Sequence, residues 1–169
     1  MKKTICRITG FLIILLLILV SLNKILAFKF SDGVSNVSNF YNQDDNTIDV
    51  LFLGSSHCFT TFNNGTLWDE YGIASYDMGT ALQPMWNSYY LLKEVLKNQK
   101  PELVVLEGYA TAFDIEYSQD SRIIKNTYGM KWSKNKIDAI MASSEEGRHL
   151  DFLPAVVLTL GSDLPPVKN

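Results

Sequence analysis

An uncharged segment near the N-terminus constrains this chain more than any other feature of its sequence. Residues 8–23 contain no charged side chain, and residues 11–20 form an unbroken apolar run. Because the ammonium of Lys24 can extend to a membrane interface while its stem stays in apolar surroundings, the stretch can continue to about position 28. It then has roughly twenty residues, the length that crosses the hydrocarbon core of a bilayer. The sequence predicts a start and membrane segment over residues 1–30.

Two interpretations of this segment remain open, an uncleaved signal anchor and a cleaved signal peptide. A signal peptide ends in a small-x-small cleavage pattern, and here Ala27 stands alone between larger side chains. This favours the anchor. The basic residues before the apolar run place the N-terminus on the cytoplasmic side, with a single span and the body outside. Cys6 then lies inside and Cys58 outside, so they do not pair, and Cys58 is expected to be a small packing residue.

The charge of the body excludes one class of function. Of the 15 basic residues, five lie within residues 1–30, which leaves ten against 18 acidic residues in the rest of the chain. Nucleic-acid binding needs clustered Lys and Arg, so we expect no nucleic-acid partner. Two cysteines are too few for a disulfide scaffold or a cysteine-rich zinc module. The acids Glu107, Asp114 and Glu116 are interpreted as a solvated loop, and no metal or cofactor is expected.

The body is predicted to be an α/β domain with a parallel sheet. Residues 31–46 are polar and are interpreted as a juxtamembrane linker. Short apolar runs, typical of strands buried on both faces, follow at residues 48–53, 73–77 and 103–106. Helices between these strands imply right-handed crossovers and a parallel sheet covered by helices.

Three helices are expected, over residues 66–71, 84–98 and 133–144. In the second, Met85, Tyr89, Leu92 and Leu96 form one apolar stripe, with Lys93 and Lys97 on another face. In the third, Ile137, Ile140 and Met141 are expected to point inward. Residues 150–160 are an apolar strand or buried segment, so the domain is taken as 47–160. Residues 161–169 are expected to form a loop-like tail.

The residues with the most chemical promise follow the predicted strands. Ligands of open α/β sheets bind beyond the carboxyl ends of the strands. Three loops lie at such ends, over residues 54–58, 78–83 and 107–113, and we expect them to converge. The first contains two serines and a histidine directly after a strand. A nucleophilic serine needs such exposure, a base, and hydrogen-bond donors for an oxyanion.

At this point the sequence resembles the SGNH/GDSL hydrolase superfamily. Residues 49–57 (Asp-Val-Leu-Phe-Leu-Gly-Ser-Ser-His) are similar to its first block, and residues 72–79 (Gly-Ile-Ala-Ser-Tyr-Asp-Met-Gly) support the likeness. The resemblance is closest to membrane-anchored bacterial members linked to teichoic-acid D-alanylation and exopolysaccharide O-acetylation. It implies a three-layer αβα, flavodoxin-like fold and a bacterial cell-membrane location.

The resemblance also implies roles for individual residues. Ser56 aligns with the nucleophile, and Ser55 stands where the GDSL form has Asp. The backbone N–H groups of Ser56 and Gly79 match oxyanion-hole positions. The asparagine that normally follows the third strand is missing from residues 107–110 (Glu-Gly-Tyr-Ala), and Gln83 is the candidate for a substitute side-chain donor.

The catalytic base is the main departure from the family. The resemblance implies a late Asp-x-x-His, but the chain has only His57 and His149, neither in that pattern. His57 is expected to be a structural or substrate-contacting residue, because adjacent side chains on a turn usually diverge. Anchored members are usually longer, so we expect the front part of a catalytic domain, inactive as this chain. Its sheet would leave an apolar edge exposed.

The sequence therefore favours an extracytoplasmic serine acyl-esterase or O-acyltransferase. Its expected substrates are acylated glycans or teichoic-acid-like polymers of the cell envelope. Two alternatives stay open. One is a non-catalytic membrane-anchored partner of an acylation complex, held beside a multispanning membrane acyltransferase. The other is a gene fragment without a function of its own.

Overall fold

A computed structural model describes residues 2–26, 32–112 and 120–148 of the 169-residue chain. Helix α1 (Lys2–Leu26) comes first, and its apolar side chains from Ile5 to Leu22 are exposed. Within the described residues it is the one helix that is long and apolar enough to cross a membrane, a test that a signal sequence also passes. The residues expected to form a strand or buried segment at 150–160 and a tail at 161–169 lie outside the described part, as does His149.

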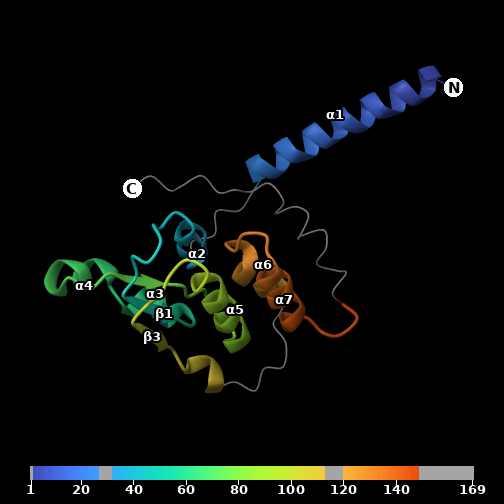
Figure 1. The fold of residues 1–169 in the computed structure, drawn as a ribbon. Coiled ribbons are helices and arrows are strands. Elements are labelled where there is room, and N and C mark those ends of the chain that lie inside the picture. Colours follow the sequence, from blue (N-terminus) through green and yellow to red (C-terminus); the bar gives the residue numbers. More distant parts are fainter. Residues whose placement is uncertain (1, 27–31, 113–119, 149–169) are drawn as a thin grey trace.

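Three parallel strands form the sheet, as predicted. They are β1 (Val50–Leu53), β2 (Ser75–Asp77) and β3 (Leu103–Leu106), in the order β2-β1-β3. Each strand lies within one of the three apolar runs. β1 is buried as expected for a strand covered on both faces. The same expectation is wrong for β3, which is largely exposed at the edge of the sheet. The fold class is therefore α/β with a three-stranded parallel sheet (Figure 1).

Helical segments alternate with the strands along the chain (Figure 1), and the edge strand β3 is left largely exposed. After α1, the structure has α2 (Val34–Phe40), α3 (Ser56–Thr61), α4 (Asn64–Tyr71), α5 (Met85–Val95), a 3-10 turn η1 (Tyr109–Ala112), α6 (Asp120–Tyr128) and α7 (Lys134–Ser143). The expected helices 66–71, 84–98 and 133–144 correspond to α4, α5 and α7. Asn63 and Ser133 cap α4 and α7 by accepting hydrogen bonds from backbone N–H groups of the first turn.

The core lies between β1 and α5. Leu51 and Leu53 of β1 pack with Leu91 and Val95 of α5 in one buried cluster. Successive side chains of a strand point to opposite faces, so Phe52 points to the other side of the sheet. There its ring stacks on that of Phe62, at the end of α3, with 4.0 Å between the ring centroids. Both faces of β1 are thus covered.

The polar linker expected over residues 31–46 contains a helix that belongs to the body, so this expectation is corrected. Val34, Val37 and Phe40 of α2 are buried, with Val37 and Phe40 in the main core cluster. The spacing of three residues puts them on one face of a helix, while the serines and asparagines between them occupy the other. The polar composition of the segment hid this apolar face.

The apolar stripe expected on α5 is also wrong. Tyr89 and Leu96 are more than half exposed, and the buried positions are Asn87, Ser88, Leu91, Glu94 and Val95. Polar side chains can occupy inward positions when other elements supply hydrogen-bond partners. Here the Glu94 carboxylate accepts hydrogen bonds from Ser133 (2.6 Å) and Asn135 (2.9 Å), at the start of α7.

The same correction applies to α7. Ile140 is buried as expected, but Ile137 and Met141 are exposed. The buried face of α7 instead includes Asn135, Lys136, Ala139 and Ser143. At its far end Ser143 accepts a hydrogen bond of 2.8 Å from the indole N–H of Trp86 on α5. Polar contacts therefore join α5 and α7 at both ends.

Candidate functional site

The loops after the three strands converge in the described residues, as predicted. A Cβ atom added at Gly79 would lie 2.8 Å from the carbonyl oxygen of Ser55. One added at Gly54 would lie 2.5 Å from Cβ of Glu107. The turn after β1 is therefore enclosed between the turns that follow β2 and β3. Glycine at 54 and 79 allows this close approach, which a larger residue would prevent.

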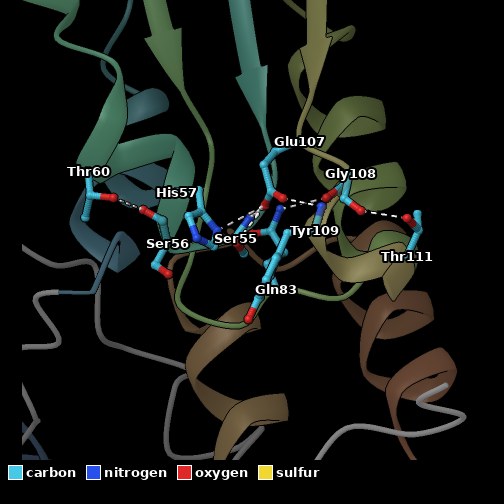
Figure 2. A network of polar contacts seen from close by, with 10 residues as sticks. Ser55, Ser56, His57, Thr60, Gln83, Glu107, Gly108, Tyr109 and Thr111 are labelled. Carbon is cyan, nitrogen blue, oxygen red and sulfur yellow. Dashed lines mark hydrogen bonds and ion pairs between the residues drawn. The ribbon is translucent and has the colours of Figure 1, made fainter. Parts of the chain in front are cut away.

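The Glu107 carboxylate is the centre of the hydrogen bonding at this edge of the sheet (Figure 2). One of its oxygens, Oε2, accepts from the Ser55 hydroxyl (2.6 Å) and from the Ser55 backbone N–H (3.0 Å). The other oxygen accepts from the Tyr109 backbone N–H. Partial burial raises the pKa of Glu107, but these hydrogen bonds outweigh burial and hold the pKa below its usual value. Glu107 therefore fixes the end of β1 to the end of β3 as a carboxylate.

His57 joins this network through Ser55. Its ring nitrogen Nδ1 lies 3.0 Å from the Ser55 hydroxyl oxygen and 3.9 Å from Glu107 Oε2. A carboxylate can only accept hydrogen bonds, so the single proton of the Ser55 hydroxyl goes to Glu107. The Ser55 oxygen then accepts from Nδ1–H of His57. In the neutral form of the imidazole, this hydrogen bond keeps the single ring proton on Nδ1 and leaves Nε2 as the acceptor.

The His57 side chain is positioned but reachable from solvent. Its ring packs edge-on against that of Tyr109, with 4.5 Å between centroids. The side chain is 52 % exposed. A neutral imidazole held at Nδ1 and open at Nε2 is an arrangement that general bases use.

Ser56, the expected nucleophile, lies beside this network without taking part in it. It is the first residue of α3, half-buried, directly after the turn that follows β1. Its carbonyl oxygen accepts from the Thr60 hydroxyl at 2.8 Å (Figure 2). Within the part of the chain that the structure describes, its own hydroxyl makes no hydrogen bond. Ser55, by contrast, is only 2 % exposed and its hydroxyl is bonded to Glu107.

The two other expected site residues form internal hydrogen bonds. The Gly79 N–H donates to the Asp77 carboxylate over 3.4 Å, and burial raises the pKa of Asp77. Gln83 is 1 % exposed, accepts from the Thr80 hydroxyl (2.8 Å) and donates to the Ser88 hydroxyl (2.9 Å). In this arrangement the Gln83 amide holds the turn after β2 to α5.

Sequence reasoning missed the positioning contacts of His57 and Glu107. The available signal was their placement directly after two strands that a parallel sheet brings together. The interpretation of Glu107 as a solvated loop acid is wrong, because its side chain is only 15 % exposed and accepts hydrogen bonds from Ser55 and Tyr109. The other two loop acids, Asp114 and Glu116, lie outside the described residues. Among the residues that are described, no group of three His, Cys, Asp or Glu side chains could hold a metal ion.

Cys58 is buried and free, and burial raises the pKa of its thiol to about 12, which suits a packing role.

Comparison of the chain with family models, with curated proteins and with solved structures gives no match.

Proposed function

We propose that this protein is an extracytoplasmic serine acyl-esterase or O-acyltransferase, with Ser56 as the nucleophile and acylated cell-envelope glycans as its class of substrate. The observation that carries the proposal is the Ser56 hydroxyl. It lies free of hydrogen bonds among the described residues, at the carboxyl end of β1, and the oriented imidazole of His57 is next to it in the chain. Nucleophilic serines require this combination of access and a nearby base. In this proposal His57 takes the part of the late histidine that the resemblance implies, so the chain is active, against the expectation from the sequence.

The reaction follows from these positions. Ser56 Oγ attacks the acyl carbonyl and gives its proton to His57 Nε2, directly or through one water molecule. Adjacent residues of a helix do not face each other, which favours the water. The oxyanion forms against the Ser56 N–H, at the unpaired start of α3. Collapse expels the alcohol, protonated by His57, and leaves an acyl-serine. Water or a glycan hydroxyl then attacks this ester, and the serine hydroxyl is regenerated.

The positive charge that His57 acquires is stabilised by its neighbours. Glu107 lies 3.9 Å from Nδ1, and the Ser55 hydroxyl bridges the two groups. The depressed pKa of Glu107 keeps this carboxylate ionised at neutral pH. Ser55, His57 and Glu107 thus serve the proposed reaction as an orienting chain, with Ser55 as a positioning residue.

Labelling with a fluorophosphonate tests the assignment of Ser56. The full chain in membranes is expected to react with the probe, and Ser56→Ala is expected to abolish labelling. Thr61→Ala, an exposed hydroxyl at the other end of α3, is the matched control and should label like the wild type. Equal labelling of the wild type and Ser56→Ala would remove Ser56 as the nucleophile.

A second function, as a non-catalytic partner in a membrane acylation complex, is favoured by the β3 edge of the sheet. Leu103 and Leu106 of β3 are about half exposed, and in the described residues β3 pairs with β1 alone. Apolar edge strands of this kind invite pairing with another chain. Leu106→Lys is expected to abolish co-purification with a multispanning membrane acyltransferase while leaving the helix content, measured by circular dichroism, unchanged. Unchanged co-purification of Leu106→Lys contradicts this second function.

A further inference from the structure

Asp32 and Gly33, the first two described residues after α1, lie against the proposed site. Asp32, the first described residue after α1, accepts a hydrogen bond of 3.1 Å from the Ala81 N–H. A Cβ atom added at Gly33 would overlap the carbonyl oxygen of Gly79. Gly79 in turn lies against the backbone of Ser55. The body is therefore entered at the carboxyl edge of the sheet, next to the turn that holds Ser56.

The length of the connection limits how far this edge can lie from α1. Six Cα–Cα steps separate Leu26, the end of α1, from Asp32. A fully extended chain covers at most about 22 Å in six steps. If α1 spans a bilayer, its end lies at the interface, so Asp32 lies within about 22 Å of the membrane surface, with the turn that is bonded to it alongside.

Leu82 is the exposed apolar side chain of the turn that Asp32 contacts. It is 47 % exposed, and its backbone has a left-handed φ of 53°. Leucine rarely adopts this conformation. Hydrogen bonds on both sides hold it there: Ala81 donates to Asp32, and the Gln83 N–H donates to the Thr80 carbonyl at 3.1 Å. Strain maintained at an exposed apolar residue points to a use for that side chain.

We propose that the turn of residues 80–83, with Leu82 at its exposed point, rests on the membrane surface. The bilayer is the partner that both observations fit, because the connection to α1 confines the turn there and the interface accepts an apolar side chain. In combination with the proposed function, this places Ser56 over the bilayer. The acyl group it receives then comes from an ester held at the membrane rather than from a polymer distant from it.

Depth-dependent quenching tests the contact without relying on catalysis. A fluorophore is attached to Leu82→Cys in full-length Cys6→Ser protein, reconstituted in vesicles that contain lipids with a quencher in the upper acyl chain. Leu96→Cys is the matched control, because Leu96 is an exposed leucine (54 %) at the opposite end of α5, near the amino ends of the strands. We expect strong quenching at 82 and little at 96. Equal quenching at the two positions, or release of the chain from the vesicles, overturns the proposal.

A second variant separates the membrane contact from folding. Asparagine tolerates a left-handed backbone better than leucine does, so Leu82→Asn is expected to be at least as stable as the wild type. Labelling of Ser56 by a long-chain fluorophosphonate dissolved in the vesicles should fall about tenfold, since a buried leucine contributes that much to association. Labelling by a short water-soluble probe should not change. Loss with both probes, or with neither, contradicts the contact, whereas absence of Ser56 labelling in the wild type contradicts only the proposed function.

Discussion

Gly33→Ala is expected to lower the free energy of unfolding by about 3 kcal/mol, because the change adds both backbone strain and a steric overlap. Gly33 has a φ of 83°, a left-handed value that alanine adopts at a cost. The added methyl group would also overlap the Gly79 carbonyl oxygen, a backbone atom with little freedom to move. Urea unfolding of the full chain in detergent micelles, followed by tryptophan fluorescence, measures the loss.

Gly72→Ala is the matched control for this change. Gly72 ends α4 with a φ of 67°, so the backbone strain is similar, but nothing lies within 4 Å of an added Cβ atom. Its expected loss is about 1 kcal/mol, from the strain alone. Equal losses for the two variants would mean that the segment after α1 does not pack against Gly79.

Glu94→Ala is expected to lower the free energy of unfolding by about 3 kcal/mol, because buried hydrogen-bond donors lose their acceptor. Glu94 is 3 % exposed and accepts from Ser133, Asn135 and Lys97, the last at 2.6 Å. The carboxylate joins α5 to the start of α7. Glu102→Ala, an exposed acid, is the control and should stay within about 0.5 kcal/mol of the wild type. A loss at Glu94 no larger than at Glu102 would contradict this role.

The stabilising role of Glu94 can be tested a second time, through the pH dependence of the free energy of unfolding. Burial raises the pKa of Glu94, but the hydrogen bonds from Lys97, Ser133 and Asn135 outweigh it and hold the pKa below the usual 4.5. A lowered pKa stabilises the folded state above the unfolded-state value, and this stabilisation is lost as the pH falls through the folded-state pKa. The wild type should therefore lose stability below about pH 4.5 more steeply than Glu94→Ala does. If the free energies of unfolding of the two proteins fall in parallel below this pH, the prediction is contradicted.

The strands were predictable because their signal is local. Each is a run of apolar residues that ends at a turn, and a parallel sheet with helical crossovers follows from the order of the elements. The buried face of α5 was not predictable in this way. Glu94 points inward because Ser133 and Asn135, some forty residues further along the chain, satisfy it. Tyr89 and Leu96 then face outward, against the apolar pattern.

Prediction of the candidate site from the sequence was limited in the same way, by contacts between residues far apart in the chain. The convergence of the three loops could be predicted from the sheet topology. The hydrogen bond between Ser55 and Glu107 could not, because it joins residues 52 positions apart. Because of that contact the two adjacent serines differ. Ser55 is buried within the hydrogen-bond network, whereas Ser56 is half-buried and lies outside it. His57 is expected from the sequence to be a structural or substrate-contacting residue, since it neighbours Ser56. Its contact with Ser55, two residues away, is what orients the ring.

The central claim, that Ser56 accepts an acyl group, is tested most directly by trapping the acyl-enzyme. The full chain in membranes is incubated with an activated acetyl ester, quenched in acid, digested, and analysed by tandem mass spectrometry. The account predicts an acetyl group on the Ser56 oxygen, absent from Ser56→Ala and still present in Thr61→Ala. Recovery of the Ser56 peptide without an acetyl group, or with the acetyl group on another residue, would contradict it.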